Sequence, residues 1–156
     1  MHYYFKDEST LRGFLQNLQD NCTKGGYFIG TCYDGMKVFQ TLQDTQMIDM
    51  KDEYGKLVYS ITKNYEIDSF TYSPDMIDMM FGQEIEVYMN SIGQTITEYL
   101  VNFEMFIELM KEYGFSLTNP QLKGKQSGIF DQKDFTYQPG MGGFDQIISK
   151  LSNLSS

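Results

Sequence analysis

Apolar residues recur at intervals of three and four residues in two stretches of the chain, a spacing typical of amphipathic helices. In the first stretch the apolar positions are Leu11, Phe14, Leu15 and Leu18. In the second they are Phe103, Phe106, Ile107, Met110 and Tyr113. The first pattern predicts a helix of about 14 residues that is over before Gly25-Gly26. Gly114 predicts the end of the second helix.

Runs of aromatic and β-branched residues predict strands elsewhere. The run Tyr27–Tyr33 follows a pair of glycines and shows no clear polar alternation. We therefore expect a strand that is buried on both faces, as in a parallel sheet. Met1–Phe5 is aromatic and resembles the end of a strand, and Phe115–Leu117 resembles the start of another. These three segments predict a parallel sheet that is only partly contained in the chain.

The segment from about Met47 to Tyr88 has a different pattern. Leu57–Thr62 and Ile85–Met89 are predicted strands, and Asp52–Lys56 is a predicted turn of the hairpin type. A short helix is expected just before this segment, at Met36–Leu42. Together these features predict an antiparallel β insertion in an otherwise α/β chain.

We expect one α/β domain with three parts. Residues 1–46 and 97–156 form its layered core, and residues 47–96 form the antiparallel insertion. Two helix-to-strand units indicate one edge of a layered sheet. The last part is predicted to include a long loop at 124–143 and a short helix at 144–151. A complete doubly wound domain would need more strands than the sequence supplies.

Composition narrows the functional classes. The 156 residues carry 12 Lys and Arg against 21 Asp and Glu, a net charge of −9, which argues against unaided binding to nucleic-acid phosphates. Two cysteines do not make a disulfide framework, so we expect a reduced, intracellular setting. No apolar run is long enough to span a membrane, and no signal peptide is evident.

Familiar cofactor and metal motifs are missing from the sequence. No glycine cluster fits the dinucleotide-binding or P-loop pattern. The single histidine and the two cysteines lack the spacing of a metal site, so we predict none. A Cys–His nucleophile pair that includes His2 has no support beyond the presence of the residue types.

Three residues remain as candidates for chemistry. Glu98 lies at a predicted strand-to-helix junction. It is either a helix N-terminal glutamate, favoured by the helix dipole, or an acceptor for the amino edge of a purine. His2 and Tyr3 are either core residues or lie at the carboxyl end of a parallel strand, where α/β sheets bind ligands. Carboxylate and aromatic groups are the types that a guanine base requires.

Two blocks of sequence resemble the mRNA cap guanine-N7 methyltransferase family, in particular the methyltransferase domain of capping enzymes from large DNA viruses. The first combines His2–Phe5, the helix with Leu11–Asn17, and Gly25–Gly35 with its G-G-Y-F-I-G-T motif. The second is Thr97–Val101, which leads to a helix ending in Glu112–Phe115. The similarity covers residues 2 to about 119 and, more weakly, the stretch Gly140–Phe144.

The resemblance implies a partial Rossmann-like class I methyltransferase fold. It also implies transfer of a methyl group from S-adenosylmethionine to N7 of the cap guanine at the 5′ end of capped RNA. By the same resemblance His2 and Glu98 bind the cap guanine, and Tyr3 lies beside the cofactor. No catalytic base or metal is implied, because guanine N7 is already a nucleophile and the enzyme works by proximity and orientation.

The sequence departs from the family pattern at both ends. The family's donor-binding half precedes the His-Tyr pair, and its closing strand should follow the last helix. The resemblance therefore implies a C-terminal half, inactive alone, with the S-adenosylmethionine site largely outside this chain. We expect the partner to be the missing N-terminal half or another capping-enzyme subunit. We expect no association with a membrane.

Two alternatives stay open. The chain could be a non-catalytic, methyltransferase-like stimulatory subunit, because an exposed sheet edge favours association. It could also belong to another S-adenosylmethionine-dependent methyltransferase that acts on a small molecule or a protein. The expected location is intracellular: the host cytoplasm or the virion if the protein is viral.

Overall fold

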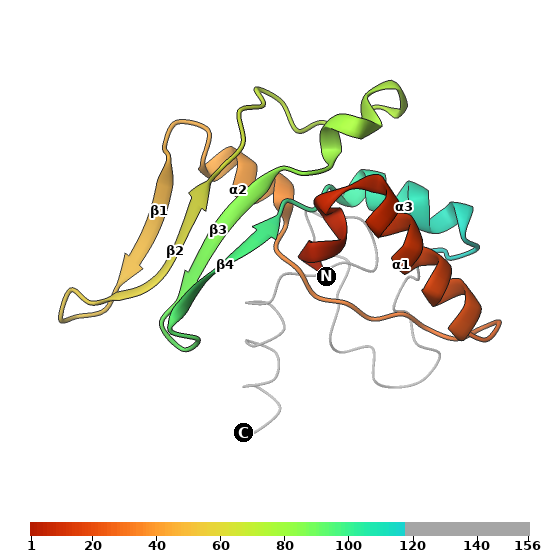
Figure 1. The fold of residues 1–156 in the computed structure, drawn as a ribbon, viewed down its shortest axis with the longest axis horizontal. Helices are drawn as coiled ribbons and strands as arrows, with labels where there is room; N and C mark the ends of the chain where they lie inside the picture. Colours follow the sequence, from red (N-terminus) through yellow and green to blue (C-terminus); the bar gives the residue numbers. More distant parts are fainter. Residues whose placement is uncertain (118–156) are drawn as a thin grey trace, which may run out of the picture. The chain divides into compact units, whose positions relative to one another are not determined.

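Four antiparallel strands and three α-helices make up the described part of the chain, residues 1–117 of a computed structural model (Figure 1). In chain order the elements are the 3-10 helix η1 (His2–Lys6), α1 (Glu8–Asn21), α2 (Gly35–Thr41), β1 (Met47–Lys51), β2 (Leu57–Lys63), the 3-10 helix η2 (Pro74–Met80), β3 (Glu84–Met89), β4 (Gln94–Tyr99) and α3 (Phe103–Glu112). The chain divides into two units, Met1–Gly114 and Phe115–Ser156, and all of these elements belong to the first.

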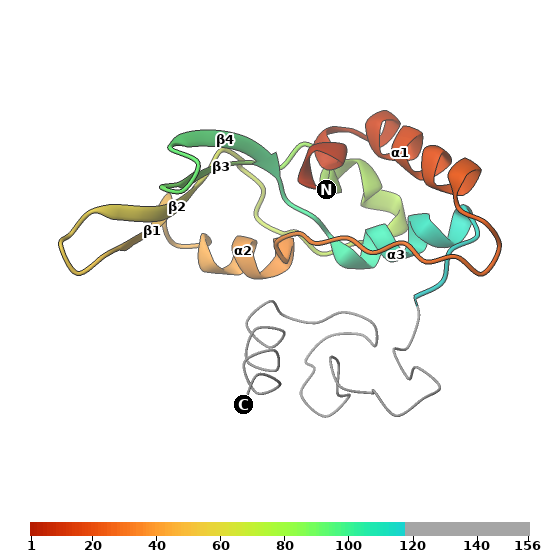
Figure 2. The same cartoon turned by 90° about the horizontal axis from the view of Figure 1, so that it is seen from below.

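The sheet has the order β1-β2-β3-β4, and each strand is antiparallel to its neighbour. Ile61 pairs with Val87, which pairs with Ile96, so these apolar side chains share one face. Glu98 lies two residues after Ile96 and therefore on the same face of the sheet, where it pairs with Ile85. Helix α2 lies against the sheet (Figure 2), and its Phe39 joins the same buried core. The sheet is therefore apolar on the face that packs and polar on the other.

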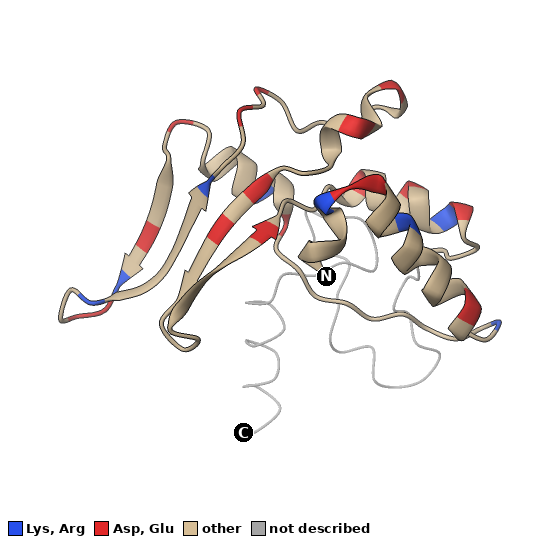
Figure 3. Ribbon diagram, viewed as in Figure 1, with Lys and Arg blue, Asp and Glu red and all other residues tan. Residues whose placement is uncertain are grey.

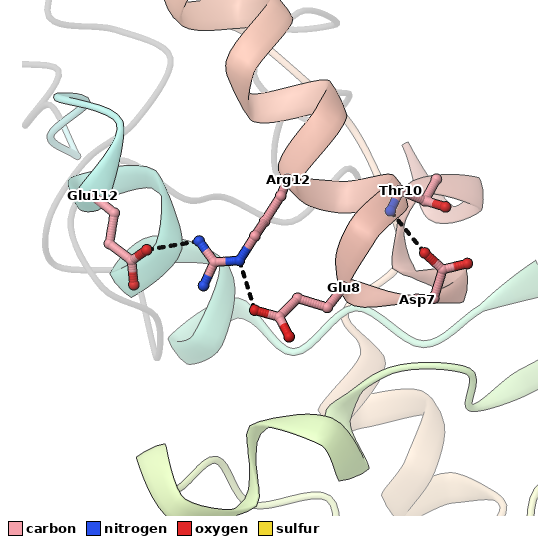
Figure 4. A network of polar contacts seen from close by, with 5 residues as sticks. All are labelled: Asp7, Glu8, Thr10, Arg12 and Glu112. Atoms are coloured by element: carbon pink, nitrogen blue, oxygen red, sulfur yellow. Dashed lines mark hydrogen bonds and ion pairs between the residues drawn. The ribbon is translucent and has the colours of Figure 1, made fainter.

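Helix α1 begins with a capped first turn and is tied to α3 by an arginine. Asp7 accepts a hydrogen bond from the Thr10 backbone N–H at 2.7 Å, which satisfies one free donor of the first turn. Arg12 extends from α1 between two carboxylates, Glu8 at 2.6 Å and Glu112 of α3 at 2.8 Å (Figure 4). Such half-exposed pairs stabilise modestly, so their main effect is to orient the two helices.

Asn102 organises the junction between β4 and α3. Its side chain is 2% exposed. Its Oδ1 accepts from the Met105 backbone N–H at 3.1 Å and caps α3, while its Nδ2 donates to the Phe70 carbonyl at 2.7 Å. The same amide nitrogen lies 3.4 Å from the Met80 sulfur. Because a buried polar group is tolerated only when it is hydrogen-bonded, this amide links α3 to the segment before η2.

Several predictions from the sequence are confirmed. The structure has helices where the apolar spacing predicted them, at α1, α2 and α3, and strands β2 and β3 at the two predicted runs. The hairpin turn at Asp52–Lys56 is present, with the Asp52 carboxylate accepting from the backbone N–H of Tyr54 at 3.0 Å and of Lys56 at 2.9 Å. The mixed helix and strand content, with its antiparallel sheet, is consistent with a partial class I methyltransferase fold.

Three strand predictions are wrong. Met1–Phe5 is not a strand end but leads into η1, and Phe5 is fully buried there. Tyr27–Tyr33 forms no strand, because every strand of the described sheet comes from the segment between β1 and β4 and none pairs with it. Phe115–Leu117 likewise has no regular structure. The predicted loop at 124–143 and helix at 144–151 lie outside the described residues, and the domain boundaries stay a prediction.

No helix between residues 1 and 117 is both long and apolar enough to cross a lipid bilayer.

The Asn102→Ala variant tests the junction. We expect it to lower the free energy of unfolding by about 2–4 kcal/mol, because it removes the α3 cap and leaves the buried Phe70 carbonyl without a donor. Urea denaturation followed by circular dichroism measures this loss. The matched control is Asp7→Ala, which removes an exposed cap with no buried partner, so its loss should be clearly smaller. Equal losses in the two variants would contradict this account of Asn102.

Candidate functional site

Two of the three candidate residues meet at the end of β4. His2 lies in η1, which packs against β4, and Glu98 is the penultimate residue of that strand. The Nδ1 atom of His2 is 3.1 Å from Oε2 of Glu98. Glu98 therefore belongs to a strand, and the alternative that it is an N-terminal helix residue is wrong, because α3 begins only at Phe103.

Two tyrosines complete the cluster around this pair. The backbone N–H of Tyr33 donates to Nε2 of His2 at 2.8 Å, and the two rings stack with centroids 4.9 Å apart. The Tyr33 ring in turn lies 6.5 Å from that of Tyr59 on β2, tilted at 55° to it. Tyr59 projects from the same face of the sheet as Glu98. We call His2, Tyr33, Tyr59 and Glu98 the His2 cluster.

His2 is neutral at physiological pH. Burial, and to a lesser degree the positive charge of the chain's α-amino group, lowers its pKa from 6.5 to about 4. The His2–Glu98 contact is therefore not an ion pair near pH 7. Because Nε2 accepts the Tyr33 N–H, a neutral imidazole must carry its proton on Nδ1, the nitrogen that faces Glu98.

Glu98 is a buried carboxylate without a hydrogen-bond donor. Its residue is 9% exposed, and Oε2 is inaccessible to solvent and has no hydrogen-bond partner among the described residues. The nearby Nδ1 atom is close enough, but its N–H does not point at Oε2 in hydrogen-bonding geometry. Burial raises the pKa of Glu98, because the charged form loses hydration. Such a group lowers the stability of the folded chain unless a ligand supplies the missing hydrogen-bond donors.

The third candidate, Tyr3, is not part of the cluster. It is 54% exposed, and its side chain makes no hydrogen bond, ion pair or ring contact with another described residue. Cys32 precedes Tyr33 and is half-buried as a free thiol, and burial raises its pKa to about 12. A thiol held protonated in this way is a poor nucleophile. The arrangement therefore favours recognition of a ligand over covalent chemistry.

The sequence did not identify Tyr33 or Tyr59 as site residues. Tyr33 lay in a run that was predicted to be a buried strand, and Tyr59 in a strand with no feature to distinguish its face. The one available signal was the position of Tyr33 directly before Asp34-Gly35, where the chain turns into α2. Contacts between residues so far apart in sequence are not encoded in any local pattern.

The pH dependence of stability tests the state of His2. Between pH 6.5 and about 4 the unfolded chain binds a proton at this residue that the folded chain does not. The free energy of unfolding should therefore fall as the pH drops through this window. The raised pKa of Glu98 acts in the opposite direction, since the folded chain binds that proton more readily as the pH falls. Comparing variants separates the two effects.

We expect the His2→Gln variant to lose this acid sensitivity, because the glutamine amide can accept the Tyr33 N–H but does not titrate. Urea denaturation of both proteins at pH 7 and pH 4.5 gives the measurement. The stability of the wild type should decrease more between the two pH values than that of the variant. Parallel curves would mean that the pKa of His2 is not lowered by folding.

The chain is similar to known proteins of one family. Residues 1–134 match the family model described as an mRNA (guanine-N(7))-methyltransferase domain. The chain is 27% identical over 119 residues to the mRNA cap guanine-N(7) methyltransferase of Saccharomyces cerevisiae, which is 76% of this chain and 27% of that protein. It is 28% identical over 135 residues to the enzyme of that name from Debaryomyces hansenii, which is 85% of this chain and 24% of that protein.

A third relative, the mRNA cap guanine-N(7) methyltransferase of Meyerozyma guilliermondii, is 25% identical over 118 residues. The match covers 75% of this chain but 20% of that protein. The chain thus spans between a fifth and about a quarter of the length of these relatives. Because the family model matches most of its residues, the chain belongs to the mRNA (guanine-N(7))-methyltransferase domain family.

Proposed function

We propose that the chain is the cap-binding part of an mRNA cap guanine-N7 methyltransferase. The observation that carries this proposal is the buried Oε2 of Glu98, which has no hydrogen-bond donor within the described residues. A guanine base presents N1–H and an N2 amino group on one edge, and a carboxylate can accept from both. His2 borders the same oxygen and contributes to the guanine site.

Recognition here depends on the base and not on phosphate charge. The Lys and Arg residues of the described part are dispersed over several elements, and acidic residues lie on α1, α3, β1, β3 and β4 (Figure 3). Phosphate binding by clustered cations is therefore not what this part of the chain offers. A carboxylate in a place of low water access discriminates between bases by hydrogen bonding, because the wrong base leaves it unpaired.

The reaction we propose needs little from the protein beyond orientation. When bound, S-adenosylmethionine supplies an electrophilic methyl group, which the N7 lone pair takes up as the carbon–sulfur bond breaks. Glu98 and His2 fix the base, and Tyr3, whose half-exposed ring makes no hydrogen bond or ring contact within the described residues, faces the cofactor. No proton has to be removed from N7, so the rate acceleration comes from holding the guanine and the methyl group in the right orientation.

We further propose that the chain is inactive alone and that most of the S-adenosylmethionine site comes from a partner, the N-terminal half of the methyltransferase or another capping-enzyme subunit. Support comes from the segment Tyr27–Cys32. No backbone hydrogen bond joins its residues to the rest of residues 1–117, and Ile29 is 88% exposed. A strand-like sequence with free backbone groups is suited to pairing with a strand from such a partner.

An intracellular location is part of the same proposal, because Cys22 and Cys32 are both free thiols. The viral setting, in the host cytoplasm or the virion, stays a prediction, since the three relatives described above come from yeasts.

Binding of capped dinucleotides tests the guanine site. We expect the 156-residue chain to bind GpppG more tightly than ApppA by about 5- to 150-fold, because adenine lacks the N1–H and N2 donors. Titration calorimetry gives both affinities. We expect Glu98→Gln to lose most of this preference and, at the same time, to unfold at a higher urea concentration at pH 7, since it removes a buried unpaired charge.

The control is Glu86→Gln, which neutralises an exposed carboxylate on the neighbouring strand β3 and should change neither property. Equal affinity of the wild type for the two dinucleotides would contradict the guanine site. If a reconstituted complex methylated GpppG equally well with Glu98→Ala, the chain would be a stimulatory subunit and not the cap-binding part.

A further inference from the structure

We propose that Tyr33 is a positioning residue for guanine recognition: its backbone amide holds His2 in the tautomer that carries a proton on Nδ1, beside Glu98. The inference rests on the function proposed above, but it concerns a residue that neither the sequence motifs nor the family comparison singled out. It makes His2 a hydrogen-bond donor of fixed direction next to an acceptor of fixed position.

The contacts on both sides of the imidazole define its proton position. On one side the Tyr33 backbone N–H donates to Nε2 at 2.8 Å, so that nitrogen must be an acceptor. On the other side Nδ1 lies 3.1 Å from Oε2 of Glu98, an atom that can only accept while the carboxylate is ionised. In the opposite tautomer, the N–H of Nε2 would face the Tyr33 backbone N–H, and the lone pair of Nδ1 would lie near the Glu98 carboxylate. The Tyr33 hydrogen bond therefore sets the proton position, and the approach of Nδ1 to Glu98, which is not itself a hydrogen bond, favours the same position.

The side chain of Tyr33 fixes the plane of the ring. It stacks on the imidazole at an interplanar angle of 20°, and its other ring neighbour is Tyr59, with centroids 6.5 Å apart. Tyr59 belongs to β2 and therefore has a rigid support. With its direction and its tautomer both set, the imidazole has lost the freedom that would otherwise have to be removed when a ligand binds.

A donor beside an acceptor gives the bound base a direction. The Glu98 carboxylate accepts from N1–H and the N2 amino group, and Nδ1–H of His2 donates to O6, the neighbouring acceptor on the guanine edge. N7 lies next to O6 on the purine, so this order places N7 on the His2 side of the site. Tyr3 follows His2 in the chain, on the side where the proposal places the methyl donor. The tautomer of His2 thus determines which atom of the guanine faces the methyl group of the cofactor.

Nitrogen NMR of the 15N-labelled 156-residue chain tests the tautomer directly. The chain contains a single histidine, so every imidazole signal belongs to His2. At pH 7 the expected spectrum is that of a neutral ring with its proton on Nδ1. A wild-type ring protonated on Nε2 would overturn the inference without recourse to any variant.

Substitution of Tyr33 tests whether its backbone N–H determines the tautomer of His2. Tyr33→Pro removes the backbone N–H, and the ring should then shift toward the Nε2–H form. Tyr33→Phe keeps the N–H and should keep the wild-type tautomer. Thr31→Pro is the matched control, because it places the same residue in the same segment where the N–H has no hydrogen-bond partner in the described structure. If Tyr33→Pro left the tautomer unchanged, the inference would fail.

Titration with GpppG separates this inference from the proposed function. We expect Tyr33→Pro to weaken GpppG binding by about tenfold, the effect of losing one oriented hydrogen bond, and Thr31→Pro to leave it unchanged. A wild type that holds the Nδ1–H form but binds no GpppG would contradict the guanine site and leave Tyr33 with a role in positioning His2 alone. GpppG binding that needs Glu98 but is equally tight in Tyr33→Pro would overturn the role of Tyr33 and preserve the guanine site.

Discussion

The close approach of Gly35 to Val101 is the contact on which the His2 cluster depends. The Gly35 backbone N–H donates to the Val101 carbonyl at 3.2 Å, and a Cβ atom at Gly35 would lie 2.4 Å from that oxygen. No side chain can be accommodated at that distance, so only glycine allows the start of α2 to lie against the segment that joins β4 to α3. Tyr33 is two residues before Gly35, and Glu98 is three before Val101. One backbone contact therefore brings both to the same place.

Two buried polar residues, only four positions apart in the chain, are treated in opposite ways by the fold. Asn102 has partners for both its donor and its acceptor, so it contributes to stability. Glu98 has a buried oxygen with no hydrogen-bond donor in the described part of the chain, and burial raises its pKa, so it costs stability. The contrast argues that Asn102 serves the architecture and that Glu98 serves a ligand. A fold that needed only to be stable would gain from an apolar residue at position 98.

The sequence predicted those elements whose signal is local. The apolar spacing in α1 and α3 records which side of a helix is buried, whatever lies against it. A strand carries no such independent signal, because its stability depends on a neighbour. Tyr27–Tyr33 has the composition of a buried strand but finds no partner strand, whereas the more polar β1 and β4, which were not predicted, are strands because they pair with β2 and β3.

The candidate site was predictable in part for the same reason. His2 and Glu98 were identified by residue type and by resemblance, and the structure brings them within 3.1 Å of each other. The resemblance itself is confirmed by the family model. Tyr33 and Tyr59 were missed because their roles arise from a stacking contact and from the register of β2, which are tertiary properties. The role of Tyr3 stays a prediction, because its half-exposed side chain makes no hydrogen bond, ion pair or ring contact with a described residue.

Under the proposed function, the burial of Glu98 has a second consequence for catalysis. Methylation at N7 places a positive charge on the guanine ring, and this charge begins to form in the transition state. A carboxylate in a poorly hydrated position is attracted to that charge more strongly than it would be in water. The attraction is greater in the transition state than with the neutral base, which is the condition for an interaction to increase the rate. The burial of Glu98 therefore lowers the stability of the folded chain and, by the same low hydration, strengthens the stabilisation of the methylation transition state.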